Sequence, residues 1–127
     1  MKIKLAKNAF VPFTVLGDPD LKTSEAIIRT YIDNGADMLE LGIAFSDPTA
    51  DGPVIQEADQ RVLNAGITTE QILKLLKRIR AYSDLPISLL SYANPIYKYG
   101  IEKFYKRMGE IGIEAILIAD LPLEEIS

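Results

Sequence analysis

The chain has 127 residues, of which 48% are hydrophobic and 25% are charged, and its formal net charge at pH 7 is −4. This composition is typical of a soluble globular protein, and the length predicts one domain over residues 1–127. The acidic balance argues against binding to nucleic acid, which needs clustered Lys and Arg. The sequence contains neither cysteine nor histidine, which excludes disulfides, thiolate nucleophiles, Ser-His-Asp triads and His-ligated zinc. Proton transfer would therefore rely on Asp, Glu, Lys or Tyr.

The sequence shows no targeting or membrane segment. The stretch MKIKLAKNAF at its start lacks the apolar core of a signal peptide. No apolar run reaches the roughly 18 residues that a membrane span needs. These features predict a cytoplasmic protein without membrane contact.

Apolar spacing predicts strands and helices that alternate along the chain. The first strand ends at a Gly-Asp-Pro turn, after which Thr23 or Ser24 is expected to cap a helix that Gly35 closes. Thr68 or Thr69 is expected to cap a later helix in the same way. The predicted strands span residues 9–17, 37–43, 85–92 and 113–122. The predicted helices span residues 24–36, 57–66, 68–82 and 101–112, and Gly112 closes the last of them. A turn or helix is expected to begin in residues 123–127.

The three later strands are continuous apolar runs. Such runs are typical of parallel strands that are buried on both faces and connected by helical crossovers. A complete (β/α)8 barrel needs about 250 residues, so four βα units correspond to half of one. A four-stranded flavodoxin-like sheet is the competing architecture on length alone. The fold class is α/β in either case.

Glu40 is the first candidate functional residue. It interrupts an apolar strand, and a carboxylate in such a strand costs several kcal/mol to bury unless it is paired or hydrogen-bonded. Functional side chains of α/β proteins gather at the C-terminal ends of parallel strands, and Glu40 lies close to such an end. It is therefore either a site residue or one half of a structural ion pair with a nearby Lys or Arg.

Further polar residues follow the ends of the strands. The loop after the second strand carries Asp47 and Asp51, and a loop that folds back over the strand would bring Asp51 and Glu40 to one pocket. The spacing of these carboxylates does not match a calcium loop, so no metal is expected. Tyr92 and Asn94 end the third strand on the same side as Glu40. They suit either a pocket for a flat aromatic ligand or a plain core followed by an Asn-Pro turn.

Four stretches of the chain resemble the α subunit of tryptophan synthase. They are FVPFTVLGDPD, GADMLELGIAFSDPTADGPVIQEA, SYANPIYKYG and ILIADLP, in this order, and they extend the resemblance over essentially the whole chain. The second stretch is close to the diagnostic signature of that family. The resemblance implies that the chain is the N-terminal half of a TIM (β/α)8-barrel, with about four βα units and parallel strands. It also implies a lyase of tryptophan biosynthesis, which cleaves indole-3-glycerol phosphate to indole and glyceraldehyde 3-phosphate by a retro-aldol reaction.

The resemblance assigns roles to particular positions. Glu40 and Asp51 fall on the two catalytic carboxylates of the family. The positions that fall on the lining of the indole pocket are Phe13, Leu90, Tyr92, Leu117 and Ala119, and those that fall on surfaces meeting the tryptophan synthase β subunit are Asp47, Pro48 and Asn94. The resemblance implies no cofactor and no metal.

The implied chemistry suits a pair of carboxyl groups. Cleavage of the bond to indole C3 needs a proton on C3 and removal of the proton from the glycerol hydroxyl, and one carboxyl group can do both in turn. A dry pocket raises the pKa of a carboxyl group, so that the group holds a proton near neutral pH. A second, ionised carboxylate that accepts the indole N–H stabilises the positive charge that develops on the ring. Glu40, on a strand, suits the first role, and Asp51, on a loop, suits the second.

The chain departs from the family pattern at two positions and in length. Ala44 stands where the family usually has proline, which is expected to loosen the loop that carries Asp51. Thr49 stands where the family usually has a branched apolar residue. From its length, the chain is expected to lack the half of the barrel that carries the phosphate site. The chain is therefore either the catalytic half of a lyase or a half-barrel fragment or engineered scaffold that folds without activity.

A half-barrel also predicts self-association. The strands around Phe13 and Ile118 would have open edges, with unpaired backbone N–H and C=O groups. The inner face would expose Leu39, Leu90 and Leu117. Two copies that pair the fourth strand of each with the first strand of the other would close an eight-stranded ring. We therefore expect a homo-oligomer, with a rearranged open sheet as the alternative.

Overall fold

The computed structural model describes residues 8–45 and 52–119. The strands are β1 (Phe13–Val15), β2 (Leu39–Gly42), β3 (Ile87–Ser91) and β4 (Ala115–Ile118), and the helices are α1 (Leu21–Asp33), α2 (Pro53–Asn64), α3 (Thr69–Tyr82), α4 (Ala93–Tyr99) and α5 (Ile101–Ile111). The strands form one parallel sheet in the order β1-β2-β3-β4. A flavodoxin-like sheet would place β1 between β2 and β3. The sequential order excludes that alternative and is the order of consecutive barrel strands.

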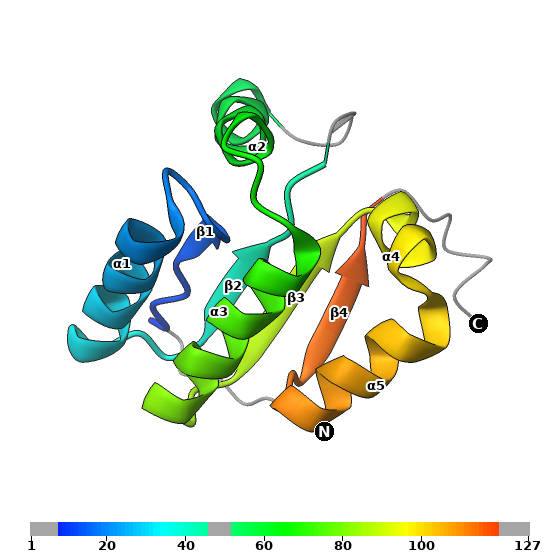
Figure 1. Cartoon of the computed structure of the whole chain (residues 1–127). Coiled ribbons are helices and arrows are strands. Elements are labelled where there is room, and N and C mark those ends of the chain that lie inside the picture. The colour runs from blue at the N-terminus through cyan, green and yellow to red at the C-terminus, as the bar shows by residue number, and fades with distance from the viewer. Residues whose placement is uncertain (1–7, 46–51, 120–127) are drawn as a thin grey trace.

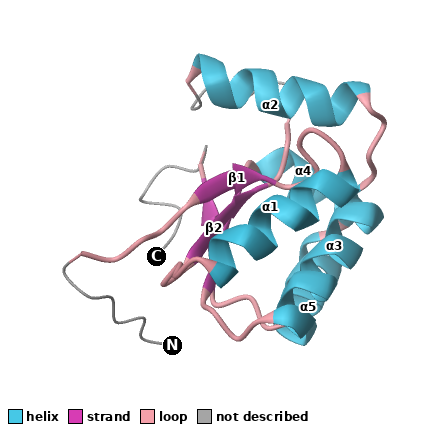
Figure 2. Ribbon diagram, turned by 90° about the vertical axis from the view of Figure 1, so that its left-hand side faces the viewer, coloured by secondary structure: helices cyan, strands magenta, loops and turns pink. Residues whose placement is uncertain are grey.

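The helices cover the sheet unequally. Helices α1, α3 and α5 lie along one face, whereas α2 and α4 lie beyond the C-terminal ends of the strands (Figure 1). Figure 2 shows α2 as a separate layer across that end of the sheet. The main core lies between the sheet and the three covering helices, and its buried side chains include Ile28, Leu41, Leu76, Ile79, Leu89, Phe104 and Met108. None of the helices in the described part of the chain has the length and apolar character that a membrane crossing requires.

The register of the strands divides their residues between two faces. Paired residues of neighbouring strands share a face, and successive residues along a strand alternate. The helix-covered face holds the buried residues Leu39, Leu41, Ile87 and Leu89. The opposite face, called the inner face below, holds two rows of paired residues: the row Phe13, Glu40, Ser88 and Ala115, and the row Val15, Gly42, Leu90 and Leu117.

The inner face is more exposed than the apolar runs predict. Leu117 is 54% exposed, so the prediction of burial on both faces is wrong for β4. The prediction that Leu39 lies exposed on the inner face is also wrong: it is 1% exposed and lies under the helices. Strands β1 and β4 each pair on one side only within the described sheet, which confirms the open edges expected around Phe13 and Ile118.

Several helix starts differ from the sequence-based expectation. The N-cap of α1 is Asp20, whose carboxylate accepts the N–H of Thr23 at 2.7 Å, and not Thr23 or Ser24. Helix α2 begins at Pro53, before the predicted start, because proline fits the first helical position without losing a hydrogen bond. The Asn-Pro turn that was one alternative after the third strand is instead helix α4 (Ala93–Tyr99). Its Pro95 lies in the first turn, where no intrahelical N–H donor is needed.

Other helix ends agree with the sequence. Thr68 caps α3 and forms a capping box with Gln71. Gly35 and Gly112 follow the ends of α1 and α5 with φ angles of +93° and +89°, a left-handed conformation that glycine adopts without a steric penalty. These ends could be predicted because each depends on residues within one turn of the helix.

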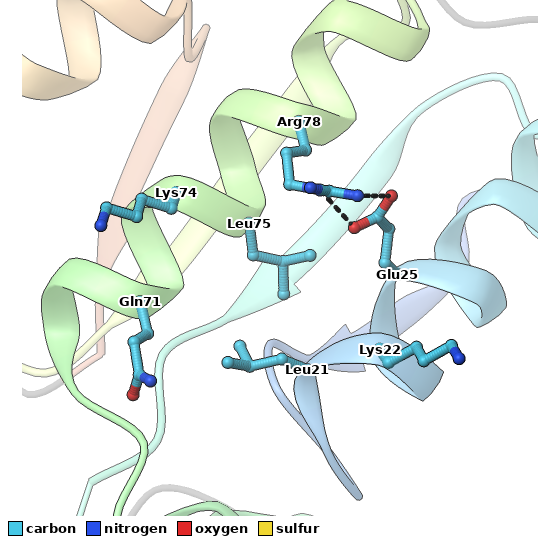
Figure 3. A pocket seen from close by; sticks show the side chains of 7 residues that line it. All are labelled: Leu21, Lys22, Glu25, Gln71, Lys74, Leu75 and Arg78. Atoms are coloured by element: carbon cyan, nitrogen blue, oxygen red, sulfur yellow. Dashed lines mark hydrogen bonds and ion pairs between the residues drawn. The ribbon is translucent and has the colours of Figure 1, made fainter.

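An ion-pair cluster joins α1 to α3 across a surface groove of about 290 Å³ (Figure 3). Arg78 donates to both carboxylate oxygens of Glu25, at 2.7 and 3.3 Å. Arg29, one turn along α1, forms a second ion pair with Glu25 at 2.7 Å. The hydrogen bond from Arg78 and the positive charges of Arg78 and Arg29 lower the pKa of Glu25.

We expect the substitution Glu25→Gln to make stability less sensitive to acid. Folding lowers the pKa of Glu25 from its ordinary value of 4.5. The ionised carboxylate therefore stabilises the folded state at pH values above 4.5, and this contribution is lost as the pH falls through the pKa of the folded state. Urea unfolding at about pH 7 and about pH 3 measures it. The difference in free energy of unfolding between wild type and variant should be positive at the higher pH and shrink at the lower one. An equal difference at both pH values would contradict the stabilising role of the Glu25 ion pairs. Glu57→Gln, at an exposed site on α2, is the control.

Candidate active site

Glu40 lies on the inner face of the sheet, in the middle of β2. Its backbone is fixed from both sides by pairing with Phe13 of β1 and Ser88 of β3, and its N–H donates to the carbonyl of Pro12 at 3.0 Å. The residue is partly buried. Within the described residues it forms no ion pair, so the interpretation as half of a structural ion pair finds no support there. The backbone of Glu40 is therefore fixed on this face, although Glu40 itself is not among the residues that line the hollow beside it.

A small hollow lies next to Glu40 on the same face. Its walls come from three strands, the residues just after two of them, and one helix. They are Phe13 and Val15 of β1, Gly42 of β2 with Ile43 just after it, Leu90 of β3, Tyr92 at the N-cap of α4, and Ile55 and Asp59 of α2. The hollow has a volume of only about 10 Å³, which is too little for an indole ring as it stands. Except for Asp59, its walls are apolar or aromatic, which is the wall composition typical of sites for flat aromatic ligands. Three of the predicted pocket residues, Phe13, Leu90 and Tyr92, thus meet in one place.

The remaining predicted pocket residues lie further along the same face. Leu117 pairs with Leu90 in the register of β3 and β4. Ala119 follows β4, and its N–H donates to the carbonyl of Ser91 at 2.8 Å. Both are thus on the β4 side of the hollow, toward the open edge.

Two aromatic contacts define the hollow's shape. Tyr92 is buried, and its ring stacks on Phe45 with 5.0 Å between ring centroids. Phe13 lies against Gly42, where an added Cβ would come within 3.0 Å of the Phe13 Cζ atom. Gly42 therefore serves a close approach of the Phe13 ring to β2, a requirement that the sequence pattern did not reveal.

We expect Gly42→Ala to displace the Phe13 ring and weaken binding of an aromatic ligand. The added methyl group would lie 3.0 Å from the Phe13 ring, so the ring has to move by a few tenths of an ångström. Titration of indole, followed by its own fluorescence because the chain contains no tryptophan, measures the effect. Gly109→Ala, in an open position on α5, is the control and should leave binding unchanged. Indole affinity that is the same in the Gly42→Ala variant and the wild type would refute this role of Gly42.

Asn94 lies apart from the hollow. It is exposed in the first turn of α4, where it lines a cavity of about 280 Å³ together with Phe45, Pro95, Lys98 and other side chains. Helix α4 is tied to α3 beside this cavity: the Tyr99 hydroxyl donates to Glu70 at 2.6 Å. This hydrogen bond and, to a smaller extent, the hydrogen bond that Arg107 donates to Glu70 lower the pKa of Glu70. The rim around Asn94 is thus held in place.

Some predicted site residues lie outside the described part of the chain. These are Asp47, Pro48, Asp51 and also Thr49. Sequence reasoning missed Asp59, a carboxylate that is only 2% exposed. A signal was present, because Asp59 lies four residues after Ile55 and three residues before Val62, on the same helical face as these apolar residues. The described residues contain no cluster of three or more carboxylates that could hold a metal ion.

Comparison with known proteins gives matches along almost the whole chain. The family model described as tryptophan synthase alpha chain matches residues 2–127. The chain belongs to this family. The tryptophan synthase alpha chain of Methanothermobacter thermautotrophicus is 56% identical over 119 residues, which cover 94% of this chain and 44% of that relative. The tryptophan synthase alpha chain of Haemophilus influenzae is 54% identical over 121 residues, which cover 93% of this chain and 45% of that relative.

Solved structures of the family have the same fold in this region. The alpha subunit from Legionella pneumophila superimposes with a TM-score of 0.88 at 37% identity, over 94% of this chain and 46% of that one. The tryptophan synthase complex from Pyrococcus furiosus superimposes with a TM-score of 0.85 at 36% identity, over 91% of this chain and 48% of that chain. The chain thus spans less than half the length of these family members, which confirms that its four parallel strands and their helices correspond to half of a TIM barrel.

Proposed function

We propose that the chain is the catalytic half of a tryptophan synthase α-type lyase, which cleaves indole-3-glycerol phosphate to indole and glyceraldehyde 3-phosphate in the cytoplasm. Glu40 carries this proposal. It is a backbone-fixed carboxylate with no ion-pair partner among the described residues. It shares the inner face with the ring of Phe13 and the side chains of Leu90 and Leu117. Membership of the family supports the choice of reaction.

In this proposal Glu40 carries both proton transfers. The protonated carboxyl group gives its proton to indole C3, and the resulting carboxylate takes the proton of the glycerol hydroxyl. The bond between C3 and the side chain then breaks, its electron pair returns to the ring, and the hydroxyl carbon becomes the aldehyde of the product. Pairing of β2 on both sides keeps the backbone of Glu40 in one position, and such fixed placement of a reacting group lowers the barrier.

The second carboxylate of the proposal is Asp51, which lies outside the described residues. It accepts a hydrogen bond from the indole N–H and stabilises the positive charge on the ring after protonation of C3. Phe13, Leu90, Tyr92, Leu117 and Ala119 hold the ring by apolar and stacking contacts. The proposal uses no metal and no cofactor.

We expect the 127-residue chain alone to release indole far more slowly than a full-length alpha chain. Binding of a non-reacting phosphate commonly positions the reacting end of a substrate, and the chain spans less than half of its relatives. An indole-release assay on the chain alone, and on the chain mixed with the C-terminal half of the Methanothermobacter thermautotrophicus alpha chain, tests this. Activity should appear in the mixture and disappear in a Glu40→Gln mixture. Turnover by the chain alone at the full-length rate would contradict the need for a second half, and no turnover in either sample would favour the inactive scaffold.

The proposed protein partner is a tryptophan synthase β subunit, contacted through Asp47, Pro48 and Asn94. Support comes from Asn94, which is exposed beside a cavity at the C-terminal end of the sheet, and from the tryptophan synthase complex to which the Pyrococcus furiosus structure belongs. Calorimetric titration of a β subunit into the Asn94→Arg variant should show weakened binding. Asn34→Arg, at the exposed far end of α1, is the control. Equal affinities of both variants would remove Asn94 from the interface.

Self-association is the proposed state when no second half is present. Each open edge leaves backbone groups unpaired, and Leu117 is 54% exposed beside the edge at β4. An exposed apolar surface next to an unpaired strand favours a second copy of the chain. Sedimentation equilibrium over a wide concentration range should therefore give a mass of a dimer or larger. A monomer at all concentrations would rule this state out.

A further inference from the structure

The groove between α1 and α3 is a surface feature that the proposed lyase site does not use. These two helices cover the face of the sheet opposite the inner face, so the groove is remote from Glu40 (Figure 1). Its lining consists of Leu21, Lys22, Glu25, Gln71, Lys74, Leu75 and Arg78. A shallow hollow of about 400 Å³ adjoins it along α3, shares Lys74 and Arg78 with it, and adds Lys77 and Ala81. The two hollows form one continuous surface, called the basic groove below.

The charge of the basic groove is opposite in sign to that of the whole chain. The chain has a net charge of −4, yet this surface holds one carboxylate and four cations, which are Lys22, Lys74, Lys77 and Arg78. The carboxylate is Glu25, which is already paired with both Arg78 and Arg29. Asp20, the N-cap of α1, interacts with Lys22 and offsets part of its charge. A positive excess therefore remains, mainly at Lys74 and Lys77.

The cations on the other side of α3 are arranged differently. Toward α5 and β4, Arg107 pairs with Glu70 at 3.2 Å and Arg80 pairs with Glu114 at 3.0 Å. No such ion pair is found in residues 8–45 and 52–119 for the lysines of the basic groove, Lys22, Lys74 and Lys77. Neighbouring like charges repel one another, and an acidic partner would remove this repulsion.

The arrangement of the side chains indicates the shape of such a partner. Leu21 and Leu75 meet in the middle of the groove, between Lys22 on α1 and Lys74 on α3 (Figure 3). Cations on opposite sides of an apolar centre do not converge on a single small anion, which binds most strongly where several donors point at it. They suit a segment that has an apolar side chain in its middle and carboxylates on both flanks.

The length of the basic groove favours a helical segment. Lys74, Lys77, Arg78 and Ala81 follow one another at spacings of three and four residues, so they lie on one face of α3. Seven residues of a helix extend over about 10 Å, or two turns. A helix of the partner that lies along α3 would present side chains at the same spacing over that distance, with one acidic flank facing α3 and the other facing α1.

We propose that the basic groove is a docking surface for an acidic amphipathic helix of another protein. The helix places an apolar side chain over Leu21 and Leu75 and its carboxylates beside the lysines on both sides of them. The inference is independent of the proposed lyase reaction, because the two sites lie on opposite faces of the sheet. Since the contacts are ionic and lie at the surface, binding is weak and is screened by salt.

Two synthetic helical peptides of about 15 residues test the proposal. One carries leucine on one face with glutamates on both flanks, and the other has glutamine in place of every glutamate. Each is labelled with fluorescein and titrated with the full chain, and binding is followed by fluorescence anisotropy. The glutamate peptide should bind more tightly. Its affinity should fall as salt is raised from about 0.01 M to about 1 M, because the Debye length shrinks from about 30 Å to about 3 Å.

A pair of double variants separates the basic groove from the total charge. Lys74→Gln with Lys77→Gln should weaken binding of the glutamate peptide about fivefold at low salt, the combined effect of two exposed ion pairs. Lys98→Gln with Lys106→Gln removes the same charge from exposed sites on α4 and α5 and should leave the affinity unchanged. The midpoint of thermal unfolding checks that each variant is folded.

Three results would overturn the proposal. They are no binding of the glutamate peptide, equal affinity for the two peptides, and equal weakening by the two double variants. If a variant does not fold, amide chemical shifts of the wild type decide the matter. Changes on addition of the glutamate peptide that lie along the first turn of α1 and the exposed face of α3 support the proposal, and changes confined to the inner face or the β4 edge overturn it.

Discussion

Glu40→Gln is expected to reduce indole release by roughly 10²–10⁴-fold in a barrel completed with a second half, the range that general acid–base groups contribute. The amide has nearly the shape of the carboxyl group but can neither give a proton to indole C3 nor take one from the hydroxyl. Since Glu40 forms no ion pair among the described residues, its replacement removes no structural partner, and stability should change little. Steady-state indole release and urea unfolding of the same samples measure both effects.

The control for this substitution is Glu57→Gln, which removes an exposed carboxylate from α2. Its turnover should equal that of the wild type. Asp51→Asn should lower the rate strongly but less than Glu40→Gln, because an amide oxygen still accepts the indole N–H but offsets less positive charge. Near-normal turnover of the Glu40→Gln variant would refute the assignment of Glu40 and, with it, the proposed lyase mechanism.

Glu114→Ala is expected to cause the largest loss of stability among polar substitutions, about 3–5 kcal/mol. Glu114 accepts the N–H of Ile87 at 2.7 Å and forms an ion pair with Arg80 at 3.0 Å, and the two charged side chains are only 11% and 18% exposed. Arg80 also donates to the carbonyls of Leu85, at 2.8 Å, and Gly112, at 2.9 Å. Glu114 therefore holds α3, β3 and the start of β4 together, and its removal leaves a poorly solvated guanidinium group without its counter-charge.

Urea unfolding measures this loss, and total stabilities of about 5–15 kcal/mol make it a large fraction of the whole. Glu110→Ala, at an exposed site on α5, is the control and should change the free energy of unfolding by no more than about 0.5 kcal/mol. The double variant with Arg80→Met should lose less than the sum of the two single losses, because the second substitution removes the charge that the first leaves unpaired. Additive losses would show that the pair contributes little.

The sequence by itself determined the kind and order of the main elements. The α3 cap at Thr68 and the glycines after α1 and α5 follow from interactions within one helical turn. Parallel strands follow from apolar runs joined by helices. Glu40 could be identified as a candidate because a carboxylate in an apolar strand is costly wherever the strand packs. The family signature around it then led to the proposed lyase reaction, and the roles of Glu40, Asp51, Asp47 and Pro48 remain predictions.

Only the tertiary structure decided which face and which partner each residue has. Leu39 and Glu40 are adjacent in the chain, yet one lies under the helices and the other on the inner face, because side chains alternate along a strand and a shift of one residue would exchange them. Asp59 became a residue of the hollow only when α2 was packed against β1. Arg78, which pairs with Glu25, lies 53 residues from it, and Arg80, which pairs with Glu114, lies 34 residues from it. Local rules extend over one helical turn or one strand, whereas these contacts depend on which elements become neighbours in the folded sheet.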